Sequence, residues 1–466
     1  MRKRTLPIDE SNCQATRSVD EDDYVVVSFE HQHQLRRHLA DHGPNTTPTS
    51  VSSAASGDED EEPRYLAEIS RIVDKLNQEF WPVNKKIHDN PEQGFQEYIA
   101  HEALTNFMES RAGWKVTRSA YGMDTAWVAV YDSGKVGPVI SYNAEMDCLP
   151  GIGQACGHNL IASASVVGAV ATAEIMKKHS LPGKIVLFGT PAEEGGGGKI
   201  KLLDAGAYSD YKCDVNLITH PGAVDDSALM RTTAYSGFKV EYFGREAHAA
   251  ANPWLGINAL DALITAYNSF SMLRQQCMAG DIIQGRITDG GIAPNIIHAY
   301  AAGHFVARAP TQARLLELKK KVDACFEAGA LATGAKLKMT PLMNYKDHVP
   351  NQVMAKSYTR YFNRLNPPHL INPARDLLQG TTQASTDQGD VSYAMPSLSV
   401  GFSIDPGPTK QGPHNPEFAK AAGTKDAFDR ACRAGKGLAG VALDLLCVEG
   451  MLDEVKKSWK ESLTKY

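Results

Sequence analysis

The chain has 466 residues, more than one compact domain usually contains, and this length predicts two or three folding units. Hydrophobic residues make up 42% of it and charged residues 22%, enough for a sizeable core, while ordinary Gly and Pro contents exclude a collagen-like chain. Lys and Arg number 48 against 54 Asp and Glu, and the net charge of −6 does not favour nucleic-acid binding, which needs a basic surface.

Residues 1–63 are predicted to form a disordered leader. Residues 45–56 read NTTPTSVSSAAS, and the acidic run DEDEE follows at 58–62. A segment of this composition has too few apolar side chains to offset the entropy that folding would cost it. A docking or regulatory arm is the alternative interpretation. The basic residues at the start precede no apolar run, so we expect no secretory signal.

The next segment, residues 64–231, is predicted to be part of an α/β domain with a mostly parallel sheet. Its first helix begins near Tyr65, where apolar residues recur at helical spacing, and a second helix covers residues 98–108. A helix of small residues follows at 159–179. The expected strands are 127–131, 139–142, 183–189 and 215–219. Strands that alternate with helices in this way form sheets covered on both faces.

Residues 232–344 show a different order of elements, β-α-β-β-α-β. The expected elements are strand 238–243, helix 258–276, strands 281–288 and 296–306, helix 311–333 and strand 336–343. This order is typical of a ferredoxin-like α+β unit. The unit interrupts the α/β domain, which resumes over residues 345–466 and ends in helices near 435–447 and 453–466.

Cysteine usage and hydropathy predict a soluble cytoplasmic protein. The eight cysteines are scattered and form no CxxC pair, as is usual in a reducing compartment. The most apolar long stretch, residues 161–176, contains polar side chains and is shorter than the roughly 20 residues that a membrane span requires. We therefore expect neither a membrane nor a nucleic acid as a partner.

Residues with distinctive chemistry follow the predicted strands. Cys156 and His158 lie two residues apart in a loop, and a thiolate beside an imidazole favours zinc or a similar metal. Glu193 and Glu194 follow the strand 183–189 and precede four glycines. In an extended backbone, two adjacent carboxylates point different ways, so one can bind a metal while the other faces a substrate.

Two further histidines belong to the same pattern. His220 ends the strand 215–219, and His414 lies in a loop bounded by prolines. Each of these features alone has an ordinary structural explanation, such as a buried thiol, a solvated turn or a surface loop. Ligands of parallel α/β sheets gather at the carboxyl ends of the strands, so we expect the features to meet. Together they supply ligands for two metal ions and a spare carboxylate, the set that a two-metal hydrolase needs.

The order of these motifs resembles that of the metallopeptidase family M20, which includes aminoacylases, carboxypeptidases and amidohydrolases. The chain is most similar to the branch with a cysteine ligand, and within it to amidohydrolases like β-alanyl-lysine dipeptidase. The strings that carry the resemblance are EMDCLPGIGQACGHN, GTPAEEGGGGK, THPG, GREAHAA, GIAPNIIH, STDQGDVSYAMP and GPHNPEF. The resemblance extends from about Tyr65 to the end of the chain and leaves out only the leader.

The resemblance implies a role for each of these residues. Residues 64–231 and 345–466 would form the catalytic domain, and residues 232–344 a lid that also joins two copies in a homodimer. Glu193 would be the general base, His248 would stabilise the oxyanion and Asn295 would help to bind the substrate. Two divalent ions, Zn or Mn, would be held by Cys156, His158, Glu194, His220 and His414.

Two positions depart from the pattern of the family. Gln154 stands where this branch often has a histidine, and its effect would fall on ligand orientation or specificity rather than on metal binding itself. Glu145 stands two residues before Asp147, where other branches carry a histidine ligand. We interpret Asp147 as a residue that orients the ligands and does not bind the metal directly.

The sequence therefore predicts a metal-dependent hydrolase that cleaves the amide bond of a dipeptide or an N-acyl amino acid. A metal-activated water would attack the carbonyl, with Glu193 accepting its proton. Two alternatives stay open. The same site would catalyse net amide condensation in a biosynthetic pathway, or the chain would be a regulatory relative without catalysis. Neither the substrate nor the choice between Zn and Mn follows from the sequence.

Overall fold

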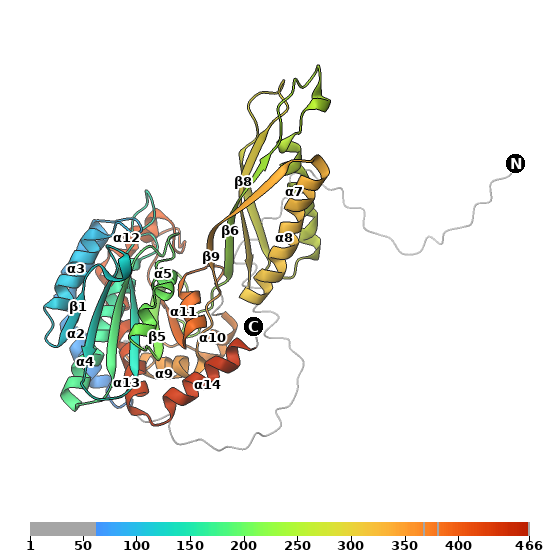
Figure 1. The fold of residues 1–466 in the computed structure, drawn as a ribbon. Helices are drawn as coiled ribbons and strands as arrows, with labels where there is room; N and C mark the ends of the chain where they lie inside the picture. Colours follow the sequence, from blue (N-terminus) through green and yellow to red (C-terminus); the bar gives the residue numbers. More distant parts are fainter. Residues whose placement is uncertain (1–61, 367–368, 380–381, 465–466) are drawn as a thin grey trace, which may run out of the picture. The chain divides into compact units, whose positions relative to one another are not determined.

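The computed structural model describes residues 62–366, 369–379 and 382–464, and the described residues belong to one compact unit. All but the last two residues of the predicted leader lie outside them, so that prediction is not addressed. The described chain contains two separate β-sheets, one of six strands and one of four (Figure 1). Each sheet has its own hydrophobic core.

The six-stranded sheet is the framework of the larger part. Its strands, in spatial order, are β1 (Trp114–Thr117), β2 (Trp127–Asp132), β4 (Lys184–Thr190), β3 (Val139–Glu145), β5 (Val215–Gly222) and β10 (Ser397–Ser403). Strands β4, β3, β5 and β10 run parallel, while β1 and β2 pair antiparallel at one edge. The predicted α/β class with a mostly parallel sheet is confirmed.

Helices cover both faces of this sheet. Helices α2 (Leu66–Asp89), α4 (His158–His179) and α13 (Lys425–Cys447) pack against one another on one face. Helices α5 (Gly198–Asp204), α6 (Ala207–Asp210) and α11 (Gln388–Ala394) cover the other face. The remaining helices of this part are α3 (Tyr98–Glu109), α9 (Gln352–Phe362), α10 (Pro373–Gln379), α12 (Pro416–Ala422) and α14 (Met451–Leu463).

Strand β4 shows why the buried strands are continuous apolar runs. Ile185 and Leu187 point into the core beneath α4, and Val186 and Phe188 point into the core beneath α5 and α6. Both faces are buried, so no polar residue alternates with them. Helix α4 is long and apolar enough to cross a membrane, with mean hydropathy 1.5, but 94% of the relevant window is buried inside the protein. It is the core helix of this part.

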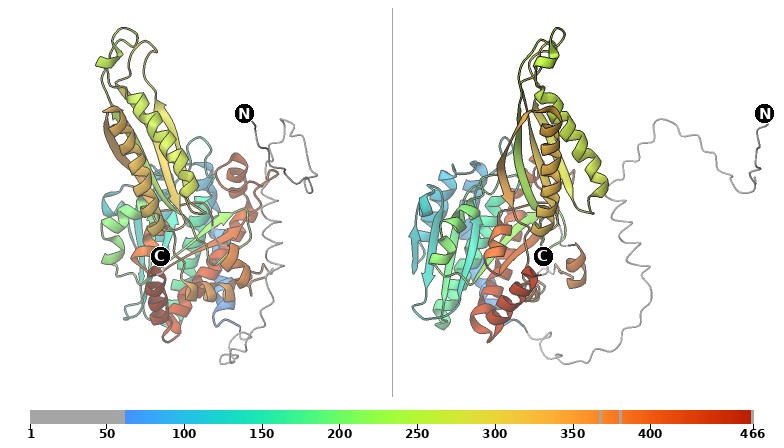
Figure 2. Two further views of the ribbon diagram at one scale, coloured as in Figure 1. Left: turned by 90° about the vertical axis from the view of Figure 1, so that its right-hand side faces the viewer. Right: turned by 45° about the vertical axis from the view of Figure 1, so that its right-hand side comes forward.

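The second sheet is antiparallel, with spatial order β7 (Ile282–Asp289), β8 (Tyr300–Ala309), β6 (Ala234–Phe243) and β9 (Lys336–Tyr345). Helices α7 (Ala259–Leu273) and α8 (Gln312–Thr333) pack together on one side of it (Figure 2). The element order is the one expected for residues 232–344. The exact domain boundaries and the role of this unit as a lid stay predictions.

Some elements differ from the sequence-based expectations. Strands β1 and β10 were not anticipated, because β1 has only four residues and β10 alternates serines with apolar residues. Residues 296–299, expected to begin a strand, lie in a loop that makes a single bridge between His248 and Ile296. Helix α7 ends at Leu273, and a short 3-10 turn covers residues 274–276.

Candidate active site

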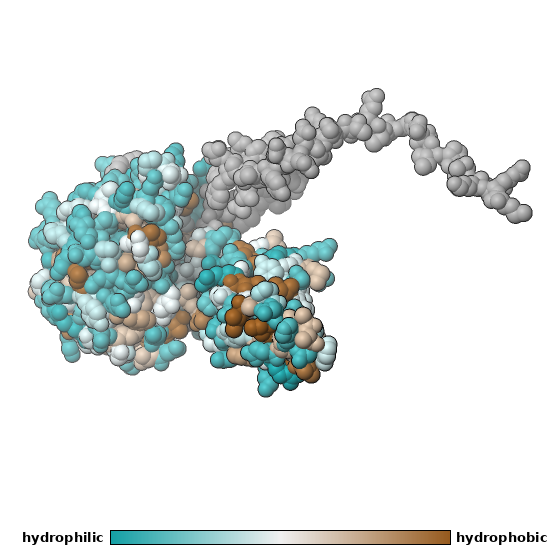
Figure 3. All heavy atoms as spheres, turned by 90° about the horizontal axis from the view of Figure 1, so that it is seen from above, coloured by the Kyte–Doolittle hydropathy of each residue, from teal (hydrophilic) through white to brown (hydrophobic). Residues whose placement is uncertain are grey.

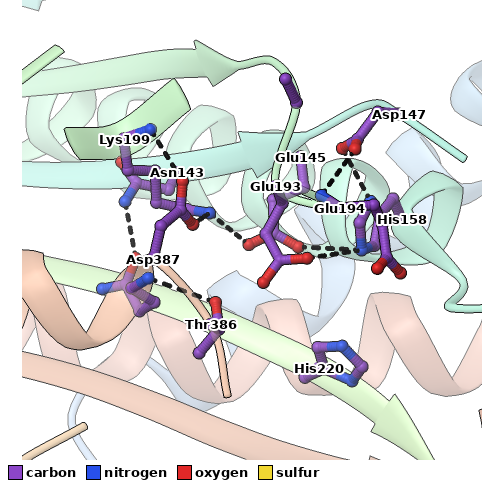
Figure 4. A network of polar contacts seen from close by, with 12 residues as sticks. Asn143, Glu145, Asp147, His158, Glu193, Glu194, Lys199, His220, Thr386 and Asp387 are labelled. Carbon is purple, nitrogen blue, oxygen red and sulfur yellow. Dashed lines mark hydrogen bonds and ion pairs between the residues drawn. The ribbon is translucent and has the colours of Figure 1, made fainter. Parts of the chain in front are cut away.

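Three of the predicted metal ligands, His158, Glu194 and His220, lie near the carboxyl ends of β3, β4 and β5 (Figure 4). His158 is the first residue of α4, and Glu194 follows β4 by four residues. His220 lies near the end of β5. Parallel strands end at the same edge of the sheet, so loops that are distant in the sequence meet there.

Four overlapping groups of donor atoms form at this edge, each with its atoms within 4.8 Å of one another. They are Cys156, His158 and His220; then Cys156, Glu194 and His414; then His158, Glu193 and Glu194; and finally Glu145, Glu193 and Asp387. The Cys156 Sγ atom lies 3.3 Å from His220 Nε2, and His414 Nε2 lies 3.2 Å from Glu194 Oε1. All five predicted ligands are therefore brought together, and neighbouring groups share a residue, as two adjacent metal ions would require.

Gly157 allows the Cys156 loop to lie against the end of β5. Its φ is +79°, in the left-handed region that favours glycine. A Cβ atom at this position would lie only 2.7 Å from Pro221 Cγ. Close approach of the two backbones places Cys156 and His158 beside His220.

The orientation of two imidazoles fits a metal. His158 Nδ1 lies 3.0 Å from the Asp147 carboxylate, and His220 Nδ1 lies 2.7 Å from the carbonyl oxygen of Pro221. These oxygens accept hydrogen bonds, so each Nδ1 carries a proton and Nε2 is the ring atom left to face a metal ion. The His158 Nε2 atom is buried and has no hydrogen-bond partner. A buried ring nitrogen without a hydrogen-bond partner, beside a thiol and carboxylates, fits a zinc-type ligand set.

Asp147 contacts two of the predicted ligands. One of its carboxylate oxygens accepts the hydrogen bond from His158 Nδ1, and the other accepts one from the Glu194 backbone N–H at 2.8 Å. The side chain is fully buried and belongs to none of the donor groups. This placement agrees with the predicted orienting role.

The two adjacent glutamates lie in different electrostatic environments. Burial raises the pKa of Glu193 well above its ordinary value, and the negative charges of Glu145 and Asp387 raise it further. Burial also raises the pKa of Glu194, but the hydrogen bond from His414 and the charge of His158 outweigh it and lower this pKa to about 2. Glu194 thus stays ionised, as a ligand must, while Glu193 is suited to accept a proton.

A buried ion cluster adjoins Glu193, and sequence reasoning missed it. Lys199 is completely buried, and its Nζ lies 2.6 Å from a Glu145 oxygen and 2.5 Å from an Asp387 oxygen. The Lys199 backbone N–H also donates to Asp387 at 2.8 Å. Glu145, which the sequence marked only as a departure from the family, is therefore the partner of a lysine. Lys199 and Asp387 stand in two of the motif strings, but no local spacing links them, since 188 residues separate them.

Gln154, the other departure, has a structural contact on each side. Its Oε1 accepts a hydrogen bond from the backbone N–H of Asn159 at 3.3 Å, and its Nε2 lies 3.5 Å from the carbonyl oxygen of Met146. The side chain thus ties the start of α4 to the end of β3.

His248 and Asn295 lie close to each other in the second sheet's unit. The backbone N–H groups of Ala250 and Ala251 donate to His248 Nδ1 at 3.2 and 3.1 Å. The ring proton of the neutral His248 therefore resides on Nε2, where it can be donated. Ala249 N–H donates to the carbonyl oxygen of Asn295 at 3.0 Å. Within residues 62–366, 369–379 and 382–464, no hydrogen bond or ion pair joins either residue to the Glu193 cluster.

Known proteins are similar to this chain in sequence. The model of peptidase family M20/M25/M40 matches residues 142–423. The Xaa-Arg dipeptidase of Mus musculus is 35% identical over 83% of this chain and 90% of its own length. The Xaa-Arg dipeptidase of Homo sapiens is 34% identical, over 84% and 92%.

Solved structures of low sequence identity share the fold. A putative aminohydrolase from methicillin resistant Staphylococcus aureus has a TM-score of 0.68 at 18% identity and covers 82% of this chain and 99% of its own. The YXEP protein of Bacillus subtilis, described as a dinuclear metal binding peptidase, has a TM-score of 0.58 at 17% identity, over 81% and 99%. The chain therefore belongs to peptidase family M20/M25/M40 and is a metal-dependent hydrolase of amide or peptide bonds.

Proposed function

We propose that the protein is a dipeptidase that releases a basic C-terminal amino acid such as arginine. The observation that carries the hydrolytic part is the convergence of the five metal-ligand candidates around Glu193, a buried carboxylate with a raised pKa. The basic residue is inferred from the similarity to two Xaa-Arg dipeptidases, each at least 34% identical over more than four fifths of this chain.

The residues of the cluster divide the work. Cys156, His158, Glu194, His220 and His414 would hold two divalent ions, which when bound lower the pKa of water and polarise the scissile carbonyl. Glu193 accepts the proton of the attacking water and passes it to the leaving amine. His248 donates a hydrogen bond from its Nε2–H to the oxyanion that develops on the carbonyl oxygen, and Asn295 helps to hold the substrate. The ions are Zn or Mn, since the thiolate favours Zn while the carboxylate tolerates Mn.

A metal measurement and a substrate panel test this proposal. Metal content is determined on the purified protein, which is then assayed with dipeptides that end in Arg, Lys, Ala or Glu and with N-acyl amino acids. The proposal is supported if kcat/KM is highest for the dipeptides that end in Arg or Lys. Cleavage restricted to N-acyl amino acids would show that these compounds, and not dipeptides, are the substrates. Amide formation with excess amine would favour the condensation alternative.

The Cys156→Ala variant is expected to lose metal at one of the two sites. A thiolate contributes charge as well as a bond, and the four other donors near it cannot replace both. Metal content is measured by mass spectrometry at limiting metal, with wild type in parallel. Cys432→Ala is the control, because Cys432 is buried in the core far from the donor groups. An unchanged metal-to-protein ratio in Cys156→Ala would make Cys156 a structural thiol.

The second sheet's unit supports a homodimer as part of the proposal. Most of the large hydrophobic side chains that are exposed in the described chain lie between residues 232 and 344, including Trp254, Met272, Ile292 and Leu331. Figure 3 shows exposed apolar surface on this unit. Exposed apolar surface of this kind marks interaction sites in soluble proteins.

The cysteines of the described chain are all free thiols, which supports a cytoplasmic location.

The His248→Ala variant is expected to bind metal normally and to lose roughly 10²–10³ in kcat, the effect of removing one oxyanion donor. If the donor acts across a dimer, mixing this variant with Glu193→Gln under subunit exchange restores part of the activity. Each mixed dimer then contains one site with both groups intact. Steady-state kinetics of the two variants and their mixture give the answer, and an active His248→Ala enzyme removes this residue from the mechanism.

A further inference from the structure

The backbone around Glu193 is held at three points by side chains from other elements. The Ala192 N–H donates to Glu97 Oε1 at 2.8 Å, and the Glu194 N–H donates to Asp147 at 2.8 Å. The Tyr345 hydroxyl donates to the carbonyl oxygen of Glu193 at 2.7 Å. Two buried carboxylates thus accept hydrogen bonds from the backbone of the residues on either side of the proposed base.

Ala192 has a strained backbone conformation. Its φ is +53°, in the left-handed region that residues with a Cβ atom rarely adopt, and the residue is 1% exposed. Its surroundings are tight, since a Cβ atom at Gly94 would lie 2.7 Å from the Ala192 Cβ and one at Gly196 would lie 2.5 Å from it. A left-handed alanine persists only where neighbouring groups stabilise it. The direction of the Glu193 side chain depends on this conformation, because the two residues are adjacent.

Glu97 is the group that meets the strained residue. Its side chain is fully buried at the start of α3, and its second oxygen accepts a hydrogen bond from the Thr125 hydroxyl at 2.6 Å. Both carboxylate oxygens are therefore engaged, one on a fixed partner and one on the Ala192 N–H. Glu97 belongs to none of the donor groups found in the described chain.

We propose that Glu97 is a positioning residue for Glu193: it holds Ala192 in the left-handed conformation and so directs the Glu193 carboxylate toward the reacting groups. The inference rests on the proposed role of Glu193 as the base. Without this contact, Ala192 relaxes toward an ordinary φ, and Glu193 turns away from its working position. A misplacement of about 1 Å is enough to cost roughly a hundredfold in rate.

The Glu97→Asp variant tests the contact. Aspartate keeps the charge at the start of α3 but is one methylene too short to reach the Ala192 N–H. We expect kcat to fall about ten- to hundredfold, with KM within about threefold of wild type and unchanged metal content. Glu97→Gln is expected to keep most of kcat, because its amide oxygen accepts from Ala192 and its amide nitrogen donates to Thr125.

A second substitution separates positioning from general support of the fold. Adding Ala192→Gly to Glu97→Asp is expected to raise kcat at least about threefold above that of Glu97→Asp alone. The reason is that glycine adopts positive φ without steric strain. A purely structural role for Glu97 predicts that kcat recovers only in step with the melting temperature. Melting temperature is measured on every variant, so that rescue of kcat is compared with rescue of stability.

Glu92 provides the matched control. It lies in the same segment, and its carboxylate accepts hydrogen bonds from the Ile99 and Ala100 N–H groups at the start of α3. The Glu92→Asp variant is therefore expected to melt at a lower temperature with an unchanged kcat. Wild-type kcat in Glu97→Asp, or no recovery on adding Ala192→Gly, overturns the inference. A failure of the proposed function shows differently, as a wild-type protein that cleaves no dipeptide.

Discussion

Replacing Glu193 by glutamine is expected to lower kcat by about 10²–10⁴-fold, the contribution of a well-placed general base. The amide has the size of the carboxyl group but cannot accept the proton of water at neutral pH. Glu193 is 7% exposed, and its nearest charged nitrogen, His158 Nε2, lies 3.8 Å away. Because the five other donors stay in place, fold and metal content should remain near wild type.

Steady-state kinetics, metal analysis and thermal unfolding of the same Glu193→Gln preparation check this expectation. Glu194→Gln is the informative comparison, since Glu194 shares a donor group with Cys156 and His414 and Glu193 does not. Its main effect should be loss of metal, with activity falling as a consequence. A Glu193→Gln enzyme with near wild-type kcat would remove Glu193 from proton transfer, and one that lost metal would make Glu193 a ligand.

Replacing Lys199 by methionine is expected to lower the free energy of unfolding by roughly 3–5 kcal/mol, the cost of breaking a buried ion pair from one side. Methionine fills a similar volume but leaves Glu145 and Asp387 as buried carboxylates without their cation. Their repulsion also acts on Glu193, whose pKa already responds to both. Loss of catalysis should therefore accompany loss of stability.

Denaturant unfolding at several pH values measures the effect of Lys199→Met. The deficit should shrink as the pH falls, because a protonated carboxyl group needs no cation, and the Asp387 pKa is already raised by burial to about 6 in the wild type. Adding Asp387→Asn to the variant should recover part of the stability by removing one unpaired charge. Lys184→Met is the control, since Lys184 pairs with Asp132 at a half-exposed site and should cost at most about 1 kcal/mol. Equal losses of unfolding free energy in the two lysine variants would contradict the expected contribution of the buried cluster to stability.

Much of the fold follows from the order of elements along the chain. The β4 run Lys184–Thr190 is apolar at every position from Ile185 to Phe188, a pattern that only a strand buried on both faces requires. The short strand β1 and the serine-rich strand β10 could not be found in this way, because their pairing partners, β2 and β5, determine them as strands. Local composition carries little information about such edge positions.

The sequence by itself determined the α/β class and predicted the metal ligands. Cys156, His158, Glu194, His220 and His414 are chemically distinctive, and parallel strands bring their ends to one edge regardless of the details of packing. Only the tertiary structure decided which atoms face the site and what supports them. The proton on His158 Nδ1, the Lys199–Asp387 pair and the Glu97–Ala192 contact each join segments that local patterns do not relate. Such contacts depend on the packing of side chains across the fold, and this packing leaves no periodic signal in the chain.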